Sequence, residues 1–190
     1  MNHFFAYINR MRFIQRWALM RNSYSENIQE HSHQVAVLAH ALAVLRNEYF
    51  GGQVDAGQVA SAALYHDAAE ILTGDMPTPI KYYNPDIRDA YKNVERVAER
   101  KLLDMLPPEL RPAYAGLLRP ADPEVETLVK AADKLAAHIK CLEELKAGND
   151  EFRRAAQQTA AALDEMELPE LGYFREHFLG SFQLTLDELE

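Results

Sequence analysis

His66 and Asp67 stand side by side in the segment ALYHDAAEILTGD, and both are residue types that bind divalent transition metals. A neutral imidazole and a carboxylate together suit borderline ions such as Mn, Fe, Co or Zn. Adjacent side chains on a helix point about 100° apart, because an α-helix has about 3.6 residues per turn. The pair can therefore hold one ion only at a crevice between helices. Glu70 follows Asp67 by three residues, so a helix would place it on the same side, where it can activate a water.

Two further segments place a polar residue among apolar ones. His31 lies one turn before Val35 on the apolar side of a predicted helix. Asp133 stands within VKAADKLAAHIK, where a buried carboxylate is unfavourable unless it is paired or bound to a metal. A single ion shared by His31, His66, Asp67 and Asp133 would satisfy polar residues from three helices at once.

Simpler interpretations of each residue remain open. A single histidine on an apolar helix is more often a hydrogen-bonded core residue than a metal ligand, and a His-Asp dipeptide arises by chance in many chains. Asp133 could instead pair with Lys130 or Lys134. The metal-site hypothesis depends on the ordered combination of these residues with the proline-rich segment TGDMPTPIKYYNP that follows His66-Asp67.

Helical periodicity and capping signals along the chain predict an all-α fold. Ser23 and Glu26 have capping-box spacing, and Asp55, Asn84 and Asp122 are predicted N-caps. The first expected element is a helix over residues 4–20 with Phe5, Ile8, Met11 and Trp17 near one face. A second helix ends before Gly51-Gly52, and a third runs from Asp55 to 72. After a loop over 73–85 we expect a helix from Asn84 to 106, a short helix to 118, helices from Asp122 to 148, from Asn149 to 166 and over 168–178, and an extended or docking tail.

The composition is that of a globular protein, with 48% hydrophobic and 26% charged residues. A length of 190 residues predicts a single domain over residues 1–190. The net charge of −9 argues against a nucleic-acid polymer as partner, because such a partner requires a broad basic face. The net charge does not exclude a small anionic substrate, since a few cations can reverse the electrostatic potential in one cleft.

The chain has one cysteine, Cys141, so no intramolecular disulfide can form and a reducing compartment is expected. The N-terminal segment MNHFFAYINRMRFIQRW carries charges throughout and does not read as a signal peptide. No segment approaches the roughly 20 apolar residues that cross a bilayer. We therefore expect a cytoplasmic protein without a membrane partner.

The order His31, His66-Asp67, Asp133 on helices resembles the HD-domain superfamily of metal-dependent phosphohydrolases. The similarity extends over residues 4–190 to the bacterial HD-domain 5'-deoxynucleotidases. It is carried by HFFAYINRMRFIQRWALMRN, SENIQEHSHQVAVLAHALA, YHDAAEILTGDMPTPIKYYN, LVKAADKLAAHIKCLEELKAGNDEF and SFQLTLDELE. The combination of RW, EHS, YHDxxE, TGDxPTP and KxxD is highly specific.

This resemblance implies a compact HD-domain helical bundle that forms a homodimer. It implies hydrolysis of deoxyribonucleoside 5'-monophosphates to deoxyribonucleosides and phosphate, with a divalent transition metal such as Co or Mn. The implied metal ligands are His31, His66, Asp67 and Asp133. Glu70 and Arg16 are the implied catalytic residues, with Glu70 activating the water and Arg16 orienting the phosphate through its planar donors.

The resemblance also implies a set of substrate contacts: Arg16, Trp17, His31, Asp67, Asp75, Met76, Pro77, Thr78 and Asp133. Taken alone, Arg16 is equally a solvated arginine, Trp17 a core or interface anchor and Asp75 a turn residue. If Asp75 crowds the C2' position of the sugar, a ribonucleotide would clash, which gives a hypothesis for deoxyribose preference. His33 departs from the expected pattern, and we expect it to point away from His31.

Two alternative functions remain. The same metal site can serve another nucleotide, such as a nucleoside triphosphate, a cyclic nucleotide or guanosine tetraphosphate, although RW and TGDxPTP disfavour this. A non-catalytic nucleotide-binding domain is the other alternative. The intact set of candidate ligands, together with Glu70, argues against it, because degenerate domains usually lose ligands.

Overall fold

The computed structural model describes residues 1–81 and 83–190, and the side chains of Thr78 and Pro79 lie outside this description. The predicted all-α fold is confirmed: the described elements are helices, joined by loops that contain one isolated antiparallel bridge, Gln15 to Asn27. The elements in chain order are α1 (Phe4–Ile8), η1 (Asn9–Phe13), α2 (Ile28–Phe50), α3 (Ala56–Tyr65), α4 (Glu70–Thr73), α5 (Thr78–Lys81), α6 (Pro85–Asp104), α7 (Arg111–Leu118), α8 (Pro123–Lys146), η2 (Asp150–Phe152), α9 (Arg153–Asp164), α10 (Pro169–His177), η3 (Leu179–Gln183) and η4 (Leu186–Glu188).

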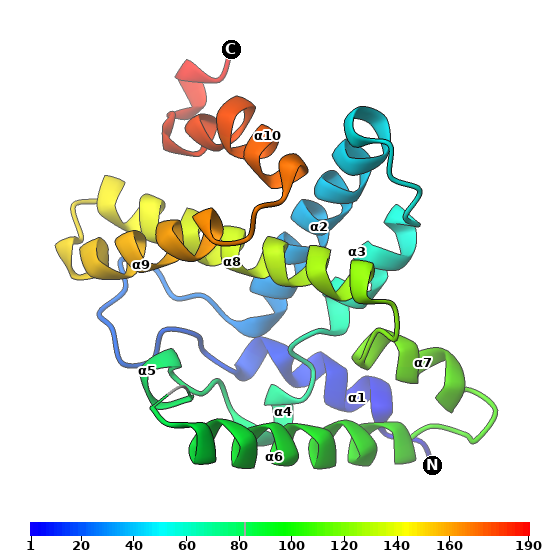
Figure 1. The fold of residues 1–190 in the computed structure, drawn as a ribbon. Coiled ribbons are helices and arrows are strands. Elements are labelled where there is room, and N and C mark those ends of the chain that lie inside the picture. The colour runs from blue at the N-terminus through cyan, green and yellow to red at the C-terminus, as the bar shows by residue number, and fades with distance from the viewer. Residues whose placement is uncertain (82) are drawn as a thin grey trace.

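The main core lies where α2, α3 and α8 pack against one another, with α9 alongside α8 and α10 against α2 (Figure 1). Val35 and Leu42 from α2, Ala63 from α3, and Leu128 and Leu135 from α8 are completely buried in it. Burial of these apolar side chains is the main contribution to stability, since each removes its surface from water. Helices α2 and α8, which carry His31 and Asp133, and α3, which leads to His66-Asp67, therefore pack together in the main core.

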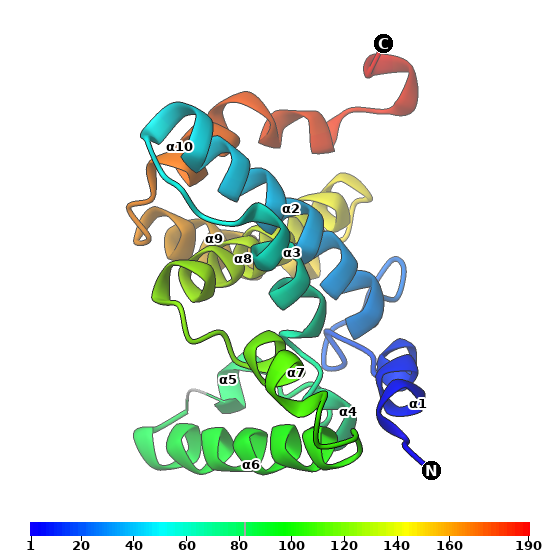
Figure 2. The ribbon, with the colours of Figure 1, turned by 90° about the vertical axis from the view of Figure 1, so that its right-hand side faces the viewer.

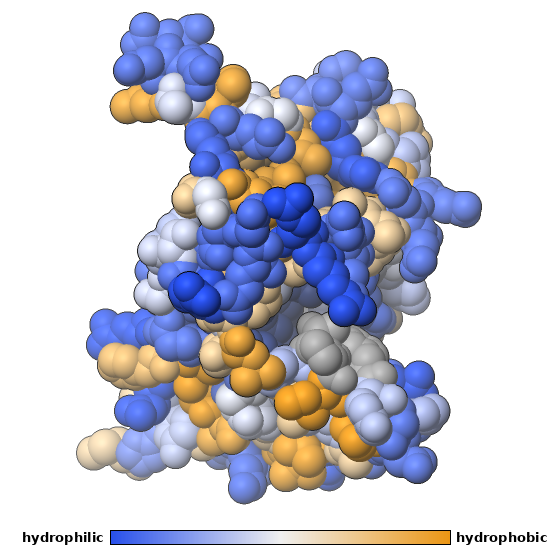
Figure 3. Space-filling view, turned by 90° about the vertical axis from the view of Figure 1, so that its left-hand side faces the viewer, coloured by the Kyte–Doolittle hydropathy of each residue, from blue (hydrophilic) through white to orange (hydrophobic). Residues whose placement is uncertain are grey.

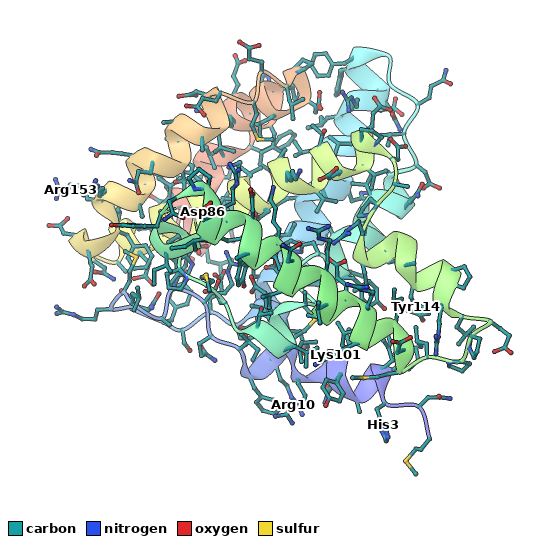
Figure 4. The ribbon with its side chains drawn as sticks, turned by 60° about the horizontal axis from the view of Figure 1, so that its bottom comes forward. His3, Arg10, Asp86, Lys101, Tyr114 and Arg153 are labelled. Atoms are coloured by element: carbon teal, nitrogen blue, oxygen red, sulfur yellow. The ribbon has the colours of Figure 1, made fainter. Side chains whose placement is uncertain are left out.

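A second cluster joins α1, α6 and α7 beneath this core, as the turned view shows (Figure 2). Phe4 is completely buried there and its ring meets that of Tyr114 edge-on, with centroids 4.9 Å apart. Phe5 and Met11, which the prediction placed near one helix face, differ in the structure: Met11 is buried, whereas Phe5 is 58% exposed. Helix α6 runs across the underside of the molecule from the end near Asp86 to the end near Lys101 (Figure 4).

Most predicted helix starts are confirmed because they depend on local capping chemistry. The side chains of Asp55, Asn84 and Asp122 accept hydrogen bonds from backbone N–H groups at the starts of α3, α6 and α8. Asn149 likewise accepts from the N–H of Glu151, although it begins the short η2 rather than α9. Helix α2 ends at Gly51, whose φ of 70° is left-handed and suits glycine.

The first helix and the start of the second were predicted wrongly. Helix α1 ends at Ile8, η1 ends at Phe13, and residues 14–27 are not helical. The capping box of α2 uses Asn27 and Glu30, not Ser23 and Glu26. Glu26 does not cap the helix, because its carboxylate accepts hydrogen bonds from the side chains of Arg16 and Trp17.

Three other boundaries also differ from the prediction. Helix α3 ends at Tyr65, and a turn separates it from the short α4. The predicted loop over 73–85 contains α5. The C-terminal tail forms the single turns η3 and η4 instead of an extended segment. Among the helices that the structure describes, none is long and apolar enough to span a membrane.

Candidate metal centre and active site

His31, His66 and Asp133 come together from α2, the turn after α3, and α8. One potential ligand atom from each lies within 4.8 Å of the others. Nε2 of His31 is 3.0 Å from Oδ1 of Asp133, and Nε2 of His66 is 3.9 Å from the same oxygen. Residues separated by up to 102 positions in the chain therefore share one small polar site inside the helical core.

Asp67 reaches the same site from the turn that follows α3. Its Oδ2 lies 3.2 Å from Nε2 of His66 and 3.7 Å from Nε2 of His31. On a continuous helix His66 and Asp67 would point about 100° apart. His66 keeps helical backbone dihedrals, and the two adjacent side chains both reach the site because it lies in the crevice between the end of α3, α2 and α8, as the sequence required. The predicted continuation of the helix to residue 72 was wrong, because the turn over residues 66–69 separates α3 from α4.

The ring orientation of His66 suits metal binding. Its Nδ1 lies 2.7 Å from the carbonyl oxygen of Ala63, the distance of a hydrogen bond donated by an N–H. This contact leaves Nε2 as the free nitrogen, and Nε2 is buried without a hydrogen-bond partner among the described residues. Histidine ligands of metals are usually held through the other ring nitrogen in this manner. Nδ1 of His31 is also buried without a described partner.

The charged groups of this cluster shift one another's pKa values. Burial raises the pKa of Asp67, but His66, His31 and Arg16 together hold it well below its usual range. Although burial raises the pKa of Asp133, the neighbouring imidazoles of His31 and His66 hold it well below its usual range. Burial lowers the pKa of His66, yet the two carboxylates raise it well above its usual value. Two ionised carboxylates and two imidazoles form a donor set that fits a divalent transition metal.

Asp133 is less enclosed than the sequence suggested. Its side chain is 41% exposed, whereas that of His31 is completely buried. The reason is a cavity of about 520 Å³ that reaches His66 and Asp133 from the surface between α6, α8 and the end of α7. The cluster is therefore open to a small molecule on this side.

The walls of this cavity carry charged side chains whose closeness to one another was not predicted from the sequence. Its charged lining beyond the cluster consists of Lys92, Glu95, Arg96, Glu99, Arg119, Glu126 and Lys130. Arg119 pairs with Glu99 at 2.6 Å, and Lys130 with Glu126 at 2.5 Å. Lys92 and Arg96, both on α6, form no ion pair with a described carboxylate. They are the two cations of this lining that are left to meet an anionic ligand without first breaking a described ion pair.

Glu70 begins α4 and lies almost completely buried, with Oε2 lacking a described hydrogen-bond partner. Burial, followed by the negative charges of Asp67 and Asp75, raises its pKa to about 9. A carboxyl group of this kind holds a proton at neutral pH and exchanges it readily when a nearby charge changes. Its position close to Asp67 agrees with the sequence prediction, although it begins a new short helix.

Arg16 and Trp17 lie in the non-helical segment beside the cluster and share one acceptor. Nε of Arg16 and Nε1 of Trp17 each donate to Oε2 of Glu26 at 3.1 Å, and Nη1 of Arg16 donates to Oδ2 of Asp67 at 3.2 Å. Trp17 has a left-handed φ of 58°. Glu26 was missed as a site residue, because its sequence position suggested only a helix cap and no periodic signal links it to Arg16.

The loop that starts at Asp75 lies next to this arrangement. Burial raises the pKa of Asp75, while the charge of Arg16 and the backbone of Trp17 lower it in part. Met76 and Pro77 are half-buried, and no polar contact joins them to the cluster within the described residues. The side chain of Thr78 lies outside the described residues. His33 is exposed, as expected, and points away from the site.

Comparison with known proteins gives consistent matches over nearly the whole chain. The sequence matches the family described as 5'-deoxynucleotidase YfbR-like over residues 3–182. A 5'-deoxynucleotidase of Vibrio cholerae serotype O1 is 53% identical over 190 residues, which cover 99% of this chain and 98% of that one. The 5'-deoxynucleotidase YfbR of Escherichia coli K12 is 50% identical over 190 residues, with 99% and 96% covered.

Solved structures confirm the predicted HD-domain helical fold. An HD-domain phosphohydrolase of Listeria innocua has a TM-score of 0.82 at 22% identity, covering 95% of this chain and 88% of that one. The HD phosphohydrolase DatZ of cyanophage S-2L, solved with dA and one catalytic Zn²⁺ ion, has a TM-score of 0.64 at 25% identity, with 93% and 96% covered.

Proposed function

The chain belongs to the YfbR-like 5'-deoxynucleotidase family and is a phosphoric monoester hydrolase of that type, and from this we propose that its His31, His66, Asp67 and Asp133 cluster hydrolyses deoxyribonucleoside 5'-monophosphates. The products are a deoxyribonucleoside and phosphate. The observation that carries the proposal is the convergence of His31, His66 and Asp133 within 4.8 Å, with Asp67 beside them and a cavity leading to them.

The four residues of the cluster are the proposed ligands of one divalent transition metal such as Co or Mn. Two imidazoles and two carboxylates suit such ions, and the hydrogen bond from His66 to Ala63 leaves the required nitrogen free. The Zn²⁺ ion in DatZ supports a metal of this class. When bound, the cation neutralises phosphate charge and lowers the pKa of its water, which supplies a nucleophile at neutral pH.

Arg16 is proposed to orient the phosphate, and Glu70 is proposed to activate the attacking water by accepting its proton. Arg16 is pre-positioned by Glu26 and by Asp67, so its planar donors already face the cluster. An incoming phosphate competes with Asp67 for Nη1 while the contact between Nε and Glu26 keeps the side chain in place. Glu70 adjoins Asp67, and the charge of a cation bound at the cluster would lower its raised pKa toward neutrality, the range suited to general acid–base catalysis.

The sugar and base are proposed to contact Trp17 and the loop Asp75, Met76, Pro77 and Thr78. The closeness of Asp75 to Arg16 and to the backbone of Trp17 supports a shared pocket wall. The dA bound to DatZ is the deoxyribonucleoside counterpart of such a product. Preference for deoxyribose through crowding of C2' by Asp75 belongs to the same proposal.

We also propose that the chain is a single-domain cytoplasmic protein that forms a homodimer and does not bind nucleic-acid polymers or membranes. Exposed apolar side chains on the N-terminal segment, including Phe5, Phe13 and Leu19, offer contact surface for a second copy. Apolar and hydrophilic areas alternate on the face shown in Figure 3, so that face does not itself indicate a large apolar interface.

A substrate panel separates the proposed activity from its alternatives. Purified protein loaded with Mn or Co is assayed for phosphate release from deoxyribonucleoside and ribonucleoside 5'-monophosphates, nucleoside triphosphates, cyclic nucleotides and guanosine tetraphosphate. We expect release mainly from the deoxyribonucleoside 5'-monophosphates. Hydrolysis restricted to another class would assign the site to a different nucleotide, and metal binding without any hydrolysis would indicate a non-catalytic domain.

A further inference from the structure

Helix α8 carries a buried ion pair that the proposed chemistry does not use. Nζ of Lys140 lies 2.5 Å from Oε1 of Glu144, and the two side chains are 2% and 0% exposed. Asp133 lies seven residues earlier on α8, about 10 Å along the helix axis. Removing two charges from water is so unfavourable that a buried pair often contributes little net stability. The pair therefore calls for an explanation other than stability of the core.

The remaining hydrogen-bonding capacity of the pair goes to the segment that carries Arg16 and Trp17. We call residues 14–27, between η1 and α2, the N-terminal strap. Nζ of Lys140 donates to the carbonyl oxygen of Tyr24 at 2.8 Å. Glu144 accepts from the backbone N–H of Ser23, with Oε2 at 2.9 Å. Figure 1 shows the strap reaching the end of the molecule where α8 meets α9.

Asn149 extends the same anchor from the residues that follow α8. Its Nδ2 donates to the carbonyl oxygen of Arg21 at 2.7 Å and to Oε2 of Glu144 at 2.8 Å. Although burial raises the pKa of Glu144, hydrogen bonds from Lys140, Asn149 and Ser23 lower it to about 2. The carboxylate stays ionised at neutral pH and holds three groups together, two of them from other segments.

Aromatic contacts connect the anchor to Trp17 itself. Nζ of Lys140 lies 3.7 Å from the centroid of the Tyr24 ring and 5.8 Å from that of Phe152. The ring of Phe152 packs against that of Trp17, with centroids 5.3 Å apart. A cation enclosed by aromatic faces is favourably placed. Displacement of the ammonium group would therefore disturb the surface on which Trp17 rests.

The other end of the strap is fixed near the cluster. The backbone N–H of Arg16 donates to the carbonyl of Glu26 at 2.9 Å, and that of Ile28 donates to the carbonyl of Ile14 at 3.0 Å. The strap is thus a closed loop with neighbouring ends, and its tip is held at α8. A non-helical loop depends on such fixed points, because it lacks the regular hydrogen bonds of a helix.

We infer that Lys140 and Glu144 are positioning residues, which hold the tip of the N-terminal strap against α8 and thereby keep Arg16 and Trp17 in place beside the cluster. The effect on substrate binding rests on the proposed function. The anchoring of the strap does not, because Trp17 is the only tryptophan of the chain and its fluorescence reports the position of the strap without turnover.

The test compares the parent protein with Lys140→Met, which keeps a long side chain but removes the ammonium. We expect the Trp17 emission maximum of Lys140→Met to move to longer wavelength and its quenching by acrylamide to increase, with an unchanged far-UV circular dichroism spectrum. If the strap is correctly placed in about a tenth of the molecules, the KM for a deoxyribonucleoside 5'-monophosphate rises about tenfold while kcat stays close to that of the parent, because saturating substrate selects the ordered form. Bound metal per chain should not change.

Lys146→Met is the matched control, since Lys146 is an exposed lysine at the end of the same helix. It should match the parent in fluorescence and in KM. If Lys140→Met does not fold, the double variant Lys140→Met with Glu144→Leu replaces the whole pair by apolar groups and leaves no unpaired charge. The double variant is expected to fold and to show the same loosened strap.

The outcomes separate the inference from the proposed function. A lower melting temperature with unchanged Trp17 emission and unchanged KM would overturn the inference, because the pair would then stabilise only the core. A shift in Trp17 emission in a protein whose parent form hydrolyses no nucleotide would support the anchoring of the strap and contradict the proposed function.

Discussion

Nη1 of Arg16 lies 3.2 Å from Oδ2 of Asp67, so the residue proposed to orient the phosphate is paired with a proposed metal ligand. The two side chains are 13% and 17% exposed, and this partial enclosure strengthens their attraction relative to a surface pair. Glu26 holds Nε of the same guanidinium at 3.1 Å. The guanidinium that is proposed to hold the phosphate is thus already oriented before substrate arrives, which reduces the reorganisation that binding would require.

Replacement of Arg16 by alanine should impair the reaction without emptying the metal site. We expect kcat/KM for a deoxyribonucleoside 5'-monophosphate to fall by about 100-fold, because a preorganised donor to the phosphate is lost. Metal content, measured by elemental analysis, should stay at the parent level. Arg12→Ala serves as control, since Arg12 is an exposed arginine nearby on η1. Equal activity of the Arg16 and Arg12 variants would remove Arg16 from the mechanism.

Glu70→Gln should separate binding from turnover. The amide keeps the size of the buried side chain but cannot exchange a proton, so we expect kcat to fall by about 100-fold or more. Metal content and substrate affinity, measured by equilibrium binding, should remain close to those of the parent. Unchanged turnover would show that Glu70 does not act on the water.

The helices of this chain could largely be predicted from sequence, because the signals are local. Asp55, Asn84 and Asp122 cap helices through contacts with residues two or three positions ahead. The apolar stripe of α2, with Val35 and Leu42, faces the core as its spacing predicts. Such features are set within one or two turns of the chain.

The features that could not be predicted depend on distant partners. Residues 14–20 leave the helical path because Ile14 and Arg16 form backbone hydrogen bonds with Ile28 and Glu26, and because the tip of the strap is bound to α8. The break between Tyr65 and Glu70 carries no glycine or proline to signal it. The cavity beside Asp133 is formed by residues of both α6 and α8. That its lysine and arginine residues lie close together could therefore not be predicted from the sequence. By contrast, the grouping of His31, His66, Asp67 and Asp133 could be predicted from their order in combination with the proline-rich segment that follows His66-Asp67.

The unpaired cations of α6 should accelerate capture of the anionic substrate. The whole chain carries a net charge of −9, so a nucleotide is repelled except where local positive charge prevails. We expect Lys92→Ala with Arg96→Ala to lower kcat/KM several-fold at low ionic strength, measured by steady-state kinetics. The difference from the parent should nearly vanish at about 1 M salt, where the Debye length is about 3 Å.

Lys101→Ala is the matched control for this double variant. Lys101 is an exposed lysine on the same helix and does not line the cavity (Figure 4). It should behave as the parent at every salt concentration. A salt dependence of Lys101→Ala equal to that of the double variant would show that overall charge, not the cavity mouth, governs capture.

Cys141 should be inert in the folded protein. The side chain is completely buried, and burial raises the pKa of its thiol to about 11. Because the thiolate is the reactive form, a thiol that stays protonated to high pH reacts slowly. We expect no labelling by a thiol reagent at pH 8 and stoichiometric labelling after unfolding in denaturant. Rapid labelling of the folded protein would contradict the observed packing of α8 against η2 and α9.

Phosphate release before and after removal of metal tests the central claim most directly. The protein is treated with a chelator, its residual metal is measured, and Mn or Co is then restored. We predict that hydrolysis of a deoxyribonucleoside 5'-monophosphate disappears with the metal and returns with it in the parent, but does not return in Asp133→Ala. Hydrolysis that continues in the metal-free protein, or that returns fully in Asp133→Ala, would contradict the assignment of this cluster as the catalytic metal centre.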